Sequence, residues 1–282
     1  MQAFHATLQE IFVPGESDMQ LFHITFALAA FLWVGVARPT VAAPDVAFPL
    51  FTMENIIGHA VETPQGEGVG DIADVVIDAA TGEVPYVVLA AGGVLKLGDK
   101  LVTIPWWTLH LEGAAKPFRL QIPLERLSKA PGFSREEWPD MEARHWRDAI
   151  HAYYGQPPYE GQHLPPEVPR TAIEQVQLPR RFLKASYVLQ SQVINPRGQR
   201  LGDIEEVVVD ATAGTVTYTV LEFGGVLGLG TKWFALPWQA LRQGEGLGTF
   251  TLDVDPEVFR ETSGFDKDRW PRQAQELRLP VK

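Results

Sequence analysis

The sequence predicts a mainly β protein, in which two small antiparallel β-barrels with short helical tails follow one transmembrane helix. The first observation behind this prediction is an internal repeat that covers most of the chain. The second is a series of short strand-like segments separated by glycine turns, a pattern typical of small barrels. The third is an apolar segment near the N-terminus.

The internal repeat appears as residue identities at one constant offset. Gly70-Asp71-Ile72 recurs as Gly202-Asp203-Ile204, which is an offset of 132 residues. Without a gap, the same offset relates Pro64 to Pro196, Asp78 to Asp210, Gly82 to Gly214, Tyr86 to Tyr218, Pro105-Trp106 to Pro237-Trp238, Gly132-Phe133 to Gly264-Phe265 and Trp138-Pro139 to Trp270-Pro271. So many shared Gly, Pro and Trp residues indicate a duplicated domain of about 80–90 residues, a normal size for a small domain.

Within each repeat, apolar residues follow the pattern of antiparallel strands. In the first copy, residues 74–78 and 84–89 flank the turn Ala80-Thr81-Gly82, as in a β-hairpin. Residues 100–106 predict a third strand that ends at a proline and a tryptophan. Residues 118–122 alternate apolar and polar side chains, which is the period of a half-buried strand. Closing such a sheet into a barrel hides edge strands that would otherwise pair with other chains.

The chain divides into six segments. Residues 1–18 form an N-terminal tail, 19–38 the transmembrane helix, 39–53 a connector, 54–155 the first barrel with its helical tail, 156–183 a proline-rich linker, and 184–282 the second barrel with a short tail. In the first tail, we expect Asp140 to cap a helix over Met141–Tyr154, which Gly155 ends. The prolines make the linker extended and semi-rigid.

The apolar segment Leu21–Ala37 allows two interpretations. It reaches the minimum length of a membrane-spanning helix, and Trp33 near one end suits the membrane interface. Arg38 directly after it then places the N-terminus outside and the barrels in the cytoplasm. A secretory signal peptide is the alternative, because Val41-Ala42-Ala43 resembles a cleavage site, although no Lys or Arg precedes the segment. We expect a retained single-pass anchor, with a periplasmic, cleaved chain as the alternative.

Composition narrows the classes of function. The net charge is −11, and a chain this acidic repels phosphate backbones, so no nucleic-acid partner is expected. The absence of cysteine excludes disulfides and thiolate sites. The sequence holds neither a G-x-S-x-G nor an H-E-x-x-H motif. We therefore expect a protein that is not an enzyme, with no catalytic residues and no metal site.

Acidic residues gather around both predicted hairpins. Paired carboxylates can relay protons or hold a cation. A solvated strand face with turn-forming Asp residues is the preferred interpretation, because alternating strands expose one face to water. The residues are Glu62, Glu67, Asp71, Asp74, Asp78 and Glu83 in the first copy, and Asp203, Glu205, Glu206 and Asp210 in the second.

Two further patterns are interpreted as structural. The glycines of residues 66–70 and 224–230 predict tight turns, because no helix follows them as it would follow a phosphate loop. His145 and His151 are six residues apart, whereas pairs of metal ligands on a helix prefer spacings of three or four. Packing or surface roles are expected for both histidines.

Tryptophans supply the candidates for partner contacts, because Trp is enriched at interfaces. Trp106 and Trp238 correspond in the repeat and are expected in the two cores. Trp107 and Trp233 have no Trp at the corresponding position, so an exposed position for either would make it a partner-contact candidate. Trp33 is the third candidate, within the apolar segment.

These motifs resemble the PRC-barrel family. The resemblance covers both repeats and rests on the Gly-Asp-Ile start, the Val-Ile-Asp or Val-Val-Asp hairpin closed by glycine, the Tyr-Val-Val-Leu or Tyr-Thr-Val-Leu strand, the Gly-Gly-Val-Leu-x-Leu-Gly turn and the Pro-Trp strand end. The family includes the cytoplasmic part of the H subunit of purple-type photosynthetic reaction centres. That subunit has one membrane helix with its N-terminus outside, then a connector and a barrel. This chain shows the same order, but it has two barrels and a less basic segment after the helix.

The resemblance implies a non-catalytic, membrane-anchored structural subunit. It would stabilise or assemble a photosynthetic reaction-centre or light-harvesting complex in the inner, photosynthetic membrane. Its expected partners are the membrane-protein subunits of that complex and the lipid bilayer. No cofactor is expected to bind directly, although neighbouring pigments or lipids would lie within contact. The alternative is an exported, soluble PRC-barrel binding protein whose signal peptide is removed.

Overall fold

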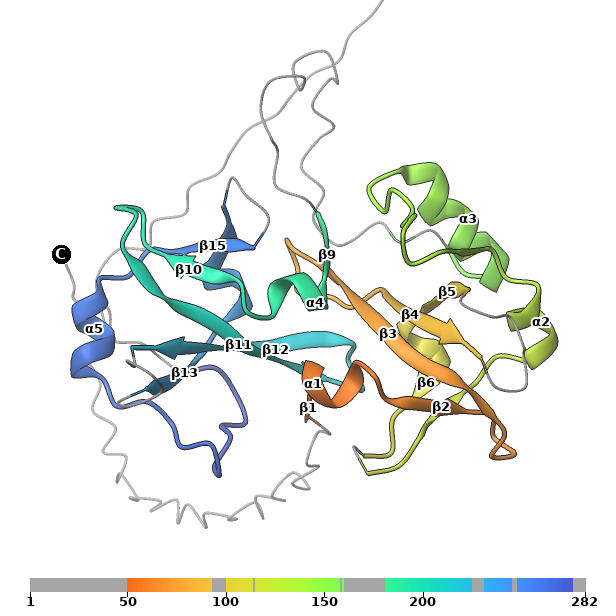
Figure 1. Ribbon diagram of the computed structural model, residues 1–282, viewed down its shortest axis with the longest axis horizontal. Helices are drawn as coiled ribbons and strands as arrows, with labels where there is room; N and C mark the ends of the chain where they lie inside the picture. The colour runs from red at the N-terminus through yellow and green to blue at the C-terminus, as the bar shows by residue number, and fades with distance from the viewer. Residues whose placement is uncertain are drawn as a thin grey trace, which may run out of the picture. The chain divides into compact units, whose positions relative to one another are not determined.

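The computed structural model describes residues 50–92, 100–113, 115–157, 159, 181–224, 231–244 and 248–275 (Figure 1). The expected transmembrane helix, residues 19–38, lies outside these residues, as does Trp33. Within the described ranges, no helix combines the length and apolar character needed to cross a membrane.

The first repeat is an antiparallel sheet that curls on itself. Its strands are β2 (Ala60–Glu62), β3 (Gly68–Asp78), β4 (Tyr86–Ala91), β5 (Leu101–Pro105), β6 (Leu109–His110), β7 (Phe118–Leu120) and β8 (Gly132–Phe133). They are ordered β6-β7-β2-β3-β4-β5-β8, and only the β2–β7 pair is parallel. The 3-10 turn η2 (Trp106–Thr108) bends the chain from β5 into β6, and helices α2 (Leu124–Ser128) and α3 (Arg144–Tyr154) follow.

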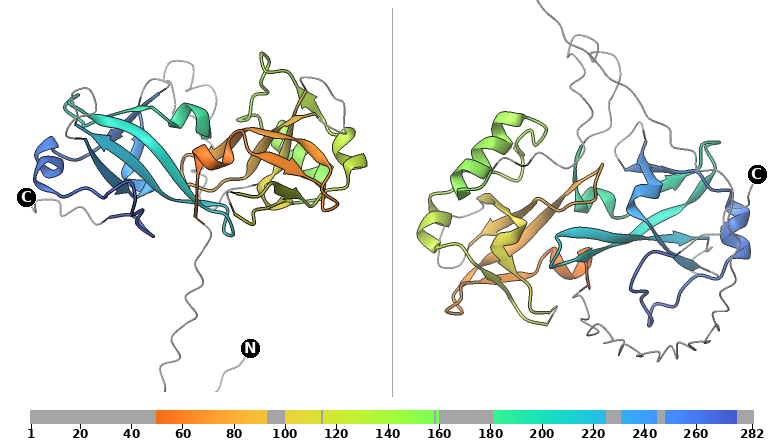
Figure 2. Two further views of the ribbon diagram at one scale, coloured as in Figure 1. Left: turned by 60° about the horizontal axis from the view of Figure 1, so that its bottom comes forward. Right: turned by 180° about the vertical axis from the view of Figure 1, so that it is seen from behind.

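The second repeat has the same architecture. Its strands are β10 (Gln192–Ile194), β11 (Arg200–Asp210), β12 (Thr215–Phe223), β13 (Lys232–Leu236), β14 (Leu241–Gln243) and β15 (Thr249–Leu252), with the turn η4 (Trp238–Ala240) and helix α5 (Pro256–Glu261). The order β13-β12-β11-β10-β15-β14 matches that of the first copy, so the predicted duplication is confirmed. Figure 2 shows the curl of both sheets from two further sides. Tyr86 and Tyr218, which correspond in the repeat, are fully buried in their respective cores.

The two repeats exchange their first strands. Strand β1 (Leu50–Thr52) precedes the first barrel in sequence but pairs with β11 of the second repeat. Strand β9 (Phe182–Lys184) precedes the second barrel but pairs with β3 of the first (Figure 1). The registers are equivalent, since Leu50 lies opposite Asp210 and Phe182 lies opposite Asp78, and both pairs shift by the repeat offset. Each barrel is therefore completed by a strand from the other.

The structure differs from the predicted domain boundaries at these two strands. The connector over 39–53 and the linker over 156–183 each extend too far, because their last residues belong to β1 and β9. Both strands bury apolar side chains, Phe51 in β1 and Leu183 in β9, and both form backbone ladders. Burial and hydrogen bonding of this kind distinguish a strand from a linker.

The tail helix begins later than predicted. Asp140 does form a polar turn, with its Oδ1 accepting from the Glu142 N–H at 3.0 Å, but helix α3 starts only at Arg144. Its end is as expected, with Gly155 in the left-handed conformation at φ 71°. The helix packs Ile150 and Tyr154 against the first barrel.

Candidate functional site

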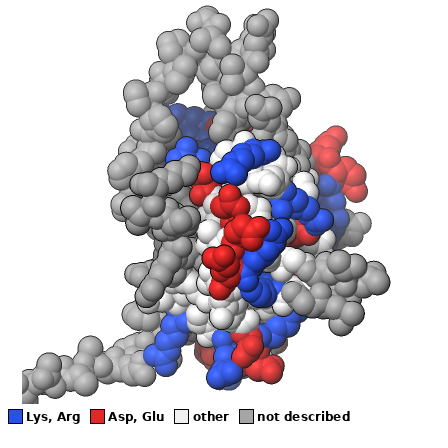
Figure 3. Space-filling view, turned by 90° about the vertical axis from the view of Figure 1, so that its left-hand side faces the viewer, with Lys and Arg blue, Asp and Glu red and all other residues white. Residues whose placement is uncertain are grey.

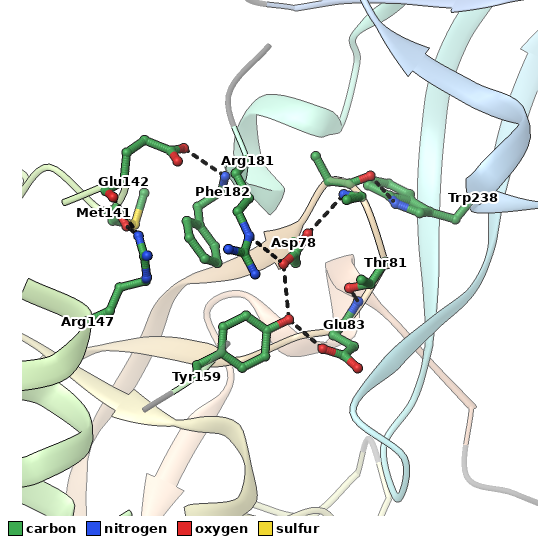
Figure 4. A network of polar contacts seen from close by, with 12 residues as sticks. Asp78, Thr81, Glu83, Met141, Glu142, Arg147, Tyr159, Arg181, Phe182 and Trp238 are labelled. Atoms are coloured by element: carbon green, nitrogen blue, oxygen red, sulfur yellow. Dashed lines mark hydrogen bonds and ion pairs between the residues drawn. The ribbon is translucent and has the colours of Figure 1, made fainter. Parts of the chain in front are cut away.

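The most elaborate polar site surrounds Asp78, where β9 joins the first barrel (Figure 4). The Asp78 side chain is fully buried, and the Nε of Arg181 lies 2.9 Å from its Oδ2. The hydroxyl of Tyr159 donates to the same oxygen at 3.1 Å and also donates to Glu83. The backbone N–H of Ala80 donates to Oδ1 at 2.9 Å, as expected for a turn-forming Asp. A buried carboxylate needs such a set of partners to offset its lost hydration.

Aromatic rings hold the arginine in place. The Arg181 guanidinium lies 5.6 Å from the ring centroid of Tyr159 and 5.0 Å from that of Phe182. Arg147 lies over the same Phe182 ring at 5.3 Å, so two cations flank one ring. Glu142 accepts the Phe182 N–H at 2.9 Å. Strand β9 is thus fixed through its backbone and through its side chains.

Loss of hydration shifts the pKa values of two ionisable groups in this network. Burial raises the pKa of the Tyr159 hydroxyl above its ordinary value, and the neighbouring Glu83 and Asp78 raise it further. Burial also raises the pKa of Glu142, although its hydrogen bond from the Phe182 N–H lowers it. Tyr159 consequently remains a hydrogen-bond donor at neutral pH.

Two tryptophans join the repeats reciprocally. The Nε1 of Trp106 donates to the Ala211 carbonyl at 3.1 Å, and the Nε1 of Trp238 donates to the Ala79 carbonyl at 3.0 Å. Each indole packs against a hairpin glycine of the other repeat, Trp106 on Gly214 and Trp238 on Gly82. Both tryptophans are buried, as expected, but they lie at the contact between the repeats as well as in the cores.

Two buried acids accept hydrogen bonds from the first turns of the short helices that follow the exchanged strands. Helices α1 (Met53–Ile56) and α4 (Ala185–Val188) follow β1 and β9. Glu206 accepts the Met53 N–H at 2.9 Å, and its counterpart Asp74 accepts the N–H of Ser186 at 3.1 Å and also its hydroxyl. Burial raises the pKa of both acids more than these hydrogen bonds lower it, and Glu206 reaches about 7.

A family model described as "PRC-barrel domain" matches residues 49–113 and 181–258, which together make up more than half of the chain. The chain belongs to the PRC-barrel family. No curated protein matches it at a significant level. Both matched segments begin at the exchanged strands, and PRC-barrel membership indicates a role in protein interaction and assembly.

The acidic clusters of the two PRC-barrels are only partly solvated faces. Asp71 and Glu205 are exposed, as expected for an alternating strand. Asp74, Asp78 and Glu206 are buried, which corrects the preferred interpretation for these three residues. Among the described residues, no group of three or more acidic or histidine side chains is placed to hold a metal ion.

The charged side chains of the second PRC-barrel are of both signs. On the face that Figure 3 shows, basic and acidic residues are interspersed. Ion pairs in this repeat join Arg197 to Asp255 at 3.2 Å and Arg269 to Asp266 at 2.8 Å. Exposed pairs of this kind contribute little to stability, so they are not the source of the fold.

The histidines pack as expected, without a shared site. His151 is buried, and its Nε2 lies 2.8 Å from the Tyr86 hydroxyl, whereas His145 is exposed. Burial lowers the pKa of His151. The predicted turn at residues 66–70 includes Gly66 at φ 85°, and residues 225–230 of the second predicted turn lie outside the described ranges.

The two described tryptophans that were candidates for partner contacts differ in exposure to solvent. Trp107 is 49% exposed and meets the condition for a partner-contact candidate. Trp233 does not, because it is buried against Phe265 and Trp270, with the Lys267 Nζ 3.5 Å from its ring centroid. The residue at the corresponding position of the first repeat is Leu101, whereas Phe265 and Trp270 have the counterparts Phe133 and Trp138, so Trp233 is a core residue that packs on an aromatic pair present in both repeats.

A surface groove of about 560 Å³ lies beside the Arg181 network. Its lining includes Trp138, Met141, Glu142, Phe182, Lys184 and Tyr187, so both repeats contribute. Tyr187 is 49% exposed, and the Lys184 Nζ lies 3.3 Å from the Trp138 centroid and 5.0 Å from that of Tyr187. Apolar and aromatic walls with a few charged groups are typical of binding grooves.

The residues in or next to β9 and α4 that form the ion pair with Asp78 and line the groove were not identified from the sequence. Arg181, Lys184 and Tyr187 fall where the repeat offset places Pro49, Thr52 and Asn55. The difference between the two copies at these positions was the signal that could have revealed them. It was not recognised because the exchanged strands β1 and β9 share no identical residue, so the repeat could not be traced through them.

Proposed function

We propose that this chain is a non-catalytic assembly subunit, anchored by residues 19–38, whose paired PRC-barrels dock on the membrane-protein subunits of a photosynthetic reaction-centre or light-harvesting complex. In this arrangement the N-terminus lies outside the inner, photosynthetic membrane and the barrels lie in the cytoplasm. The chain binds no cofactor itself, and neighbouring pigments or lipids are contacts of the complex.

The observation that carries the docking part of the proposal is the groove lined by Trp138, Met141 and Tyr187. Large apolar and aromatic side chains on a concave surface are the residues that contribute most to protein–protein affinity. Strand exchange fixes the two walls of the groove relative to each other, since Tyr187 follows β9, which pairs with the first barrel. A preformed site loses less entropy on binding than a flexible one.

The membrane and photosynthetic parts rest on the order of segments in the sequence. An apolar run, a connector and then a PRC-barrel resemble the H subunit of purple-type reaction centres. The apolar run Leu21–Ala37 is long enough for a thin span, and Arg38 gives the orientation. The second barrel, which that subunit lacks, would enlarge the docking surface.

The test is purification of the full chain from native membranes under mild detergent. Intact-mass measurement reports whether residues 1–43 are retained, and the co-purifying proteins identify the complex. Trp138→Ala combined with Tyr187→Ala should lower recovery of the partner subunits by about tenfold or more. The matched control is His145→Ala, which alters an exposed side chain elsewhere in the first repeat.

The sequence Val41-Ala42-Ala43 favours one second candidate, an exported PRC-barrel binding protein. In that case the mature protein begins near residue 44 and is recovered from the periplasm. A trimmed, water-soluble chain without photosynthetic partners would overturn the membrane proposal and leave the groove as the binding site of a periplasmic partner.

A further inference from the structure

The contact between the two repeats is self-complementary. The backbone contacts of the hairpins and the two tryptophan contacts each have a counterpart in which the two repeats change roles, whereas the Arg181–Asp78 ion pair has none, because Pro49 stands at the equivalent position. The hairpin N–H groups show this, since Val84 donates to the Gly214 carbonyl and Val216 donates to the Gly82 carbonyl, both at 2.8 Å. Glu83 and Thr215, which correspond in the repeat, face each other in an isolated antiparallel bridge. The two repeats are thus related as the subunits of a twofold dimer would be, and a contact of this type uses the same surface on both sides.

We infer that this face of the second repeat, which the first repeat covers within one chain, is a homotypic docking surface that a second copy of the same repeat occupies when chains or halves exchange partners. The hairpin backbone groups and the tryptophan that the second repeat takes from the first are also present in a second copy of itself, whereas the buried Met53 and Ile56 would be replaced by the smaller Ala185 and Val188. This inference concerns residues 181–282 and is independent of the membrane and photosynthetic proposal.

The exchanged strand β9 could take the place of β1 in a pair of second repeats. In a pair of second repeats, β9 of one copy would lie on β11 of the other, where β1 lies now. The residues of β9 are Phe182, Leu183 and Lys184 in place of Leu50, Phe51 and Thr52 of β1. The apolar positions are kept, and Glu206 remains available to accept the Ser186 N–H, as Asp74 does in this structure.

Trp238 and Arg181 would also find partners in a pair of second repeats. Trp238 of one copy would find Gly214 and the Ala211 carbonyl of the other, the groups that Trp106 contacts now. Arg181 would find Asp210, which occupies the position of Asp78. A pair of second repeats could therefore form an Arg181–Asp210 counterpart of the Arg181–Asp78 ion pair that fastens β9 to the first barrel in this structure, at a carboxylate that is only partly buried here.

A pair of first repeats would lack that ion pair. The sequence has Pro49 where the second repeat has Arg181, so the fully buried Asp78 would lose its cation. A buried charge deprived of its partner is strongly unfavourable. The inference thus predicts an asymmetry, in which second repeats pair with each other and first repeats pair far less.

The experiment uses the full chain with a protease site placed between residues 160 and 180. After cleavage, the two halves are unfolded in urea, refolded together under oxidation and separated on a non-reducing gel. Thr215→Cys places a thiol at the bridge position, so that only a pair of second repeats brings two such thiols face to face. Glu83→Cys is the matched variant for a pair of first repeats. The natural chain has no cysteine, so no other disulfide can form.

The expected result is a cross-linked pair of second halves from Thr215→Cys at a yield about tenfold above the cross-linked pair of first halves from Glu83→Cys. Native mass spectrometry of the same refolded samples should show the mixed pair as well, which verifies that both halves refold. Asp210→Asn keeps the turn acceptor for the Thr212 N–H but removes the charge that Arg181 would meet, and it should lower the second-half pair about tenfold while sparing the mixed pair.

Equal cross-linking yields from the two cysteine variants would overturn the inference, as would refolded mixed pairs without any pair of second halves. If refolding recovers no mixed pair, the cleaved protein is instead incubated in urea below its unfolding transition, where the halves exchange partners without losing their fold. Absence of the second-half pair there would also overturn it.

Discussion

Asp78 depends strongly on its polar partners, because its carboxylate has no exposure to water. Replacing Arg181 with Met should lower the free energy of unfolding by about 3 kcal/mol, since a buried charge is left without its cation. The Tyr159 hydroxyl and the Ala80 N–H remain as partners and limit the loss. Equilibrium urea unfolding measures the effect.

The control for this prediction is Arg200→Met, which breaks an exposed pair with Asp203. It should change the free energy of unfolding by no more than about 0.5 kcal/mol. Adding Asp78→Asn to Arg181→Met should restore part of the lost stability, because the uncompensated charge is removed. A double variant less stable than Arg181→Met alone would show that the ion pair is not the cause.

Glu206 makes stability depend on pH. Its pKa of about 7 in the folded protein lies above the ordinary value of 4.5, so the folded state keeps a proton that the unfolded chain loses. The free energy of unfolding should therefore fall as pH rises from about 4.5 to 7, by about 3 kcal/mol from this residue, and the deficit should persist above pH 7. Glu54 faces the same carboxylate and strengthens the trend by repulsion.

Replacing Glu206 with Gln should remove this contribution, because the amide oxygen still accepts the Met53 N–H but carries no charge. The measurement is urea unfolding at pH 5 and pH 8 for both proteins. We expect the variant to gain stability relative to the natural chain only at the higher pH. Glu67→Gln, at an exposed turn, is the matched control and should leave the pH dependence unchanged. An identical pH dependence in the Glu206 variant would refute the assignment.

The sequence could not predict that these acids are buried. Strand alternation assigned Asp74 and Glu206 to a solvated face, but irregular pairing between Ile72 and Asp74, and between Ile204 and Glu206, interrupts the alternation in both copies. Beyond these bulges, the exchanged strands extend the sheets at their edges, and the helices that follow them, α1 and α4, bring the N–H groups that Glu206 and Asp74 accept. Local pattern cannot reveal a bulge, or a strand and helix that are supplied by another part of the chain.

At the scale of elements, the hairpin turns are shaped by the tryptophans that rest on them. Gly214 has φ 63°, and a Cβ built there would lie 2.7 Å from the Trp106 Cδ1. Gly214→Ala should therefore combine backbone strain with overpacking and lower the free energy of unfolding by about 3 kcal/mol in total. Thermal and urea unfolding would both report the loss.

Gly198 separates these two effects, because it has φ 76° but no neighbouring atom within 4 Å of the position that a Cβ would take. Gly198→Ala should show the backbone cost alone, about 1 kcal/mol. In the first repeat, Gly82→Ala should be milder than Gly214→Ala, since its Cβ would lie 3.0 Å from the Trp238 Cδ1. Equal losses at Gly198 and Gly214 would mean that the indole contact is unimportant.

Most elements were predictable from local sequence, whereas their pairing was not. The hairpin of β3 and β4 and its copy follow from alternation and glycine turns. The exchange does not, because the edge positions that the exchanged strands meet are nearly the same, Val76-Ile77-Asp78 in β3 and Val208-Val209-Asp210 in β11. The strands that differ are Leu50–Thr52 and Phe182–Lys184, which share no identical residue, together with Arg181, which pairs with Asp78.

At the scale of the molecule, strand exchange couples the stability of the two barrels. The described residues of both repeats belong to one compact unit, and neither barrel has its full set of strands without the other. We expect the chain to unfold in a single cooperative transition, with calorimetric and van't Hoff enthalpies in agreement. Differential scanning calorimetry of the full chain tests this expectation.

Two resolved transitions would contradict this coupling, because independent barrels unfold at their own temperatures. A second check uses Arg181→Met, which acts on the first barrel and on β9 together. Tryptophan fluorescence, which reports on both repeats, and far-ultraviolet circular dichroism should shift to the same lower midpoint. Different midpoints for the two signals would indicate that the two barrels unfold independently.

The exchanged strand β1 also sets the route by which tension travels through the molecule. Whatever holds the first 49 residues pulls directly on Leu50, and the three antiparallel pairs of β1 with β11 carry that pull into the barrel that is farther along the chain. The same pull also passes along the chain through α1 and β2 into the nearer barrel. A pull at the N-terminus is thus shared by both barrels from the outset.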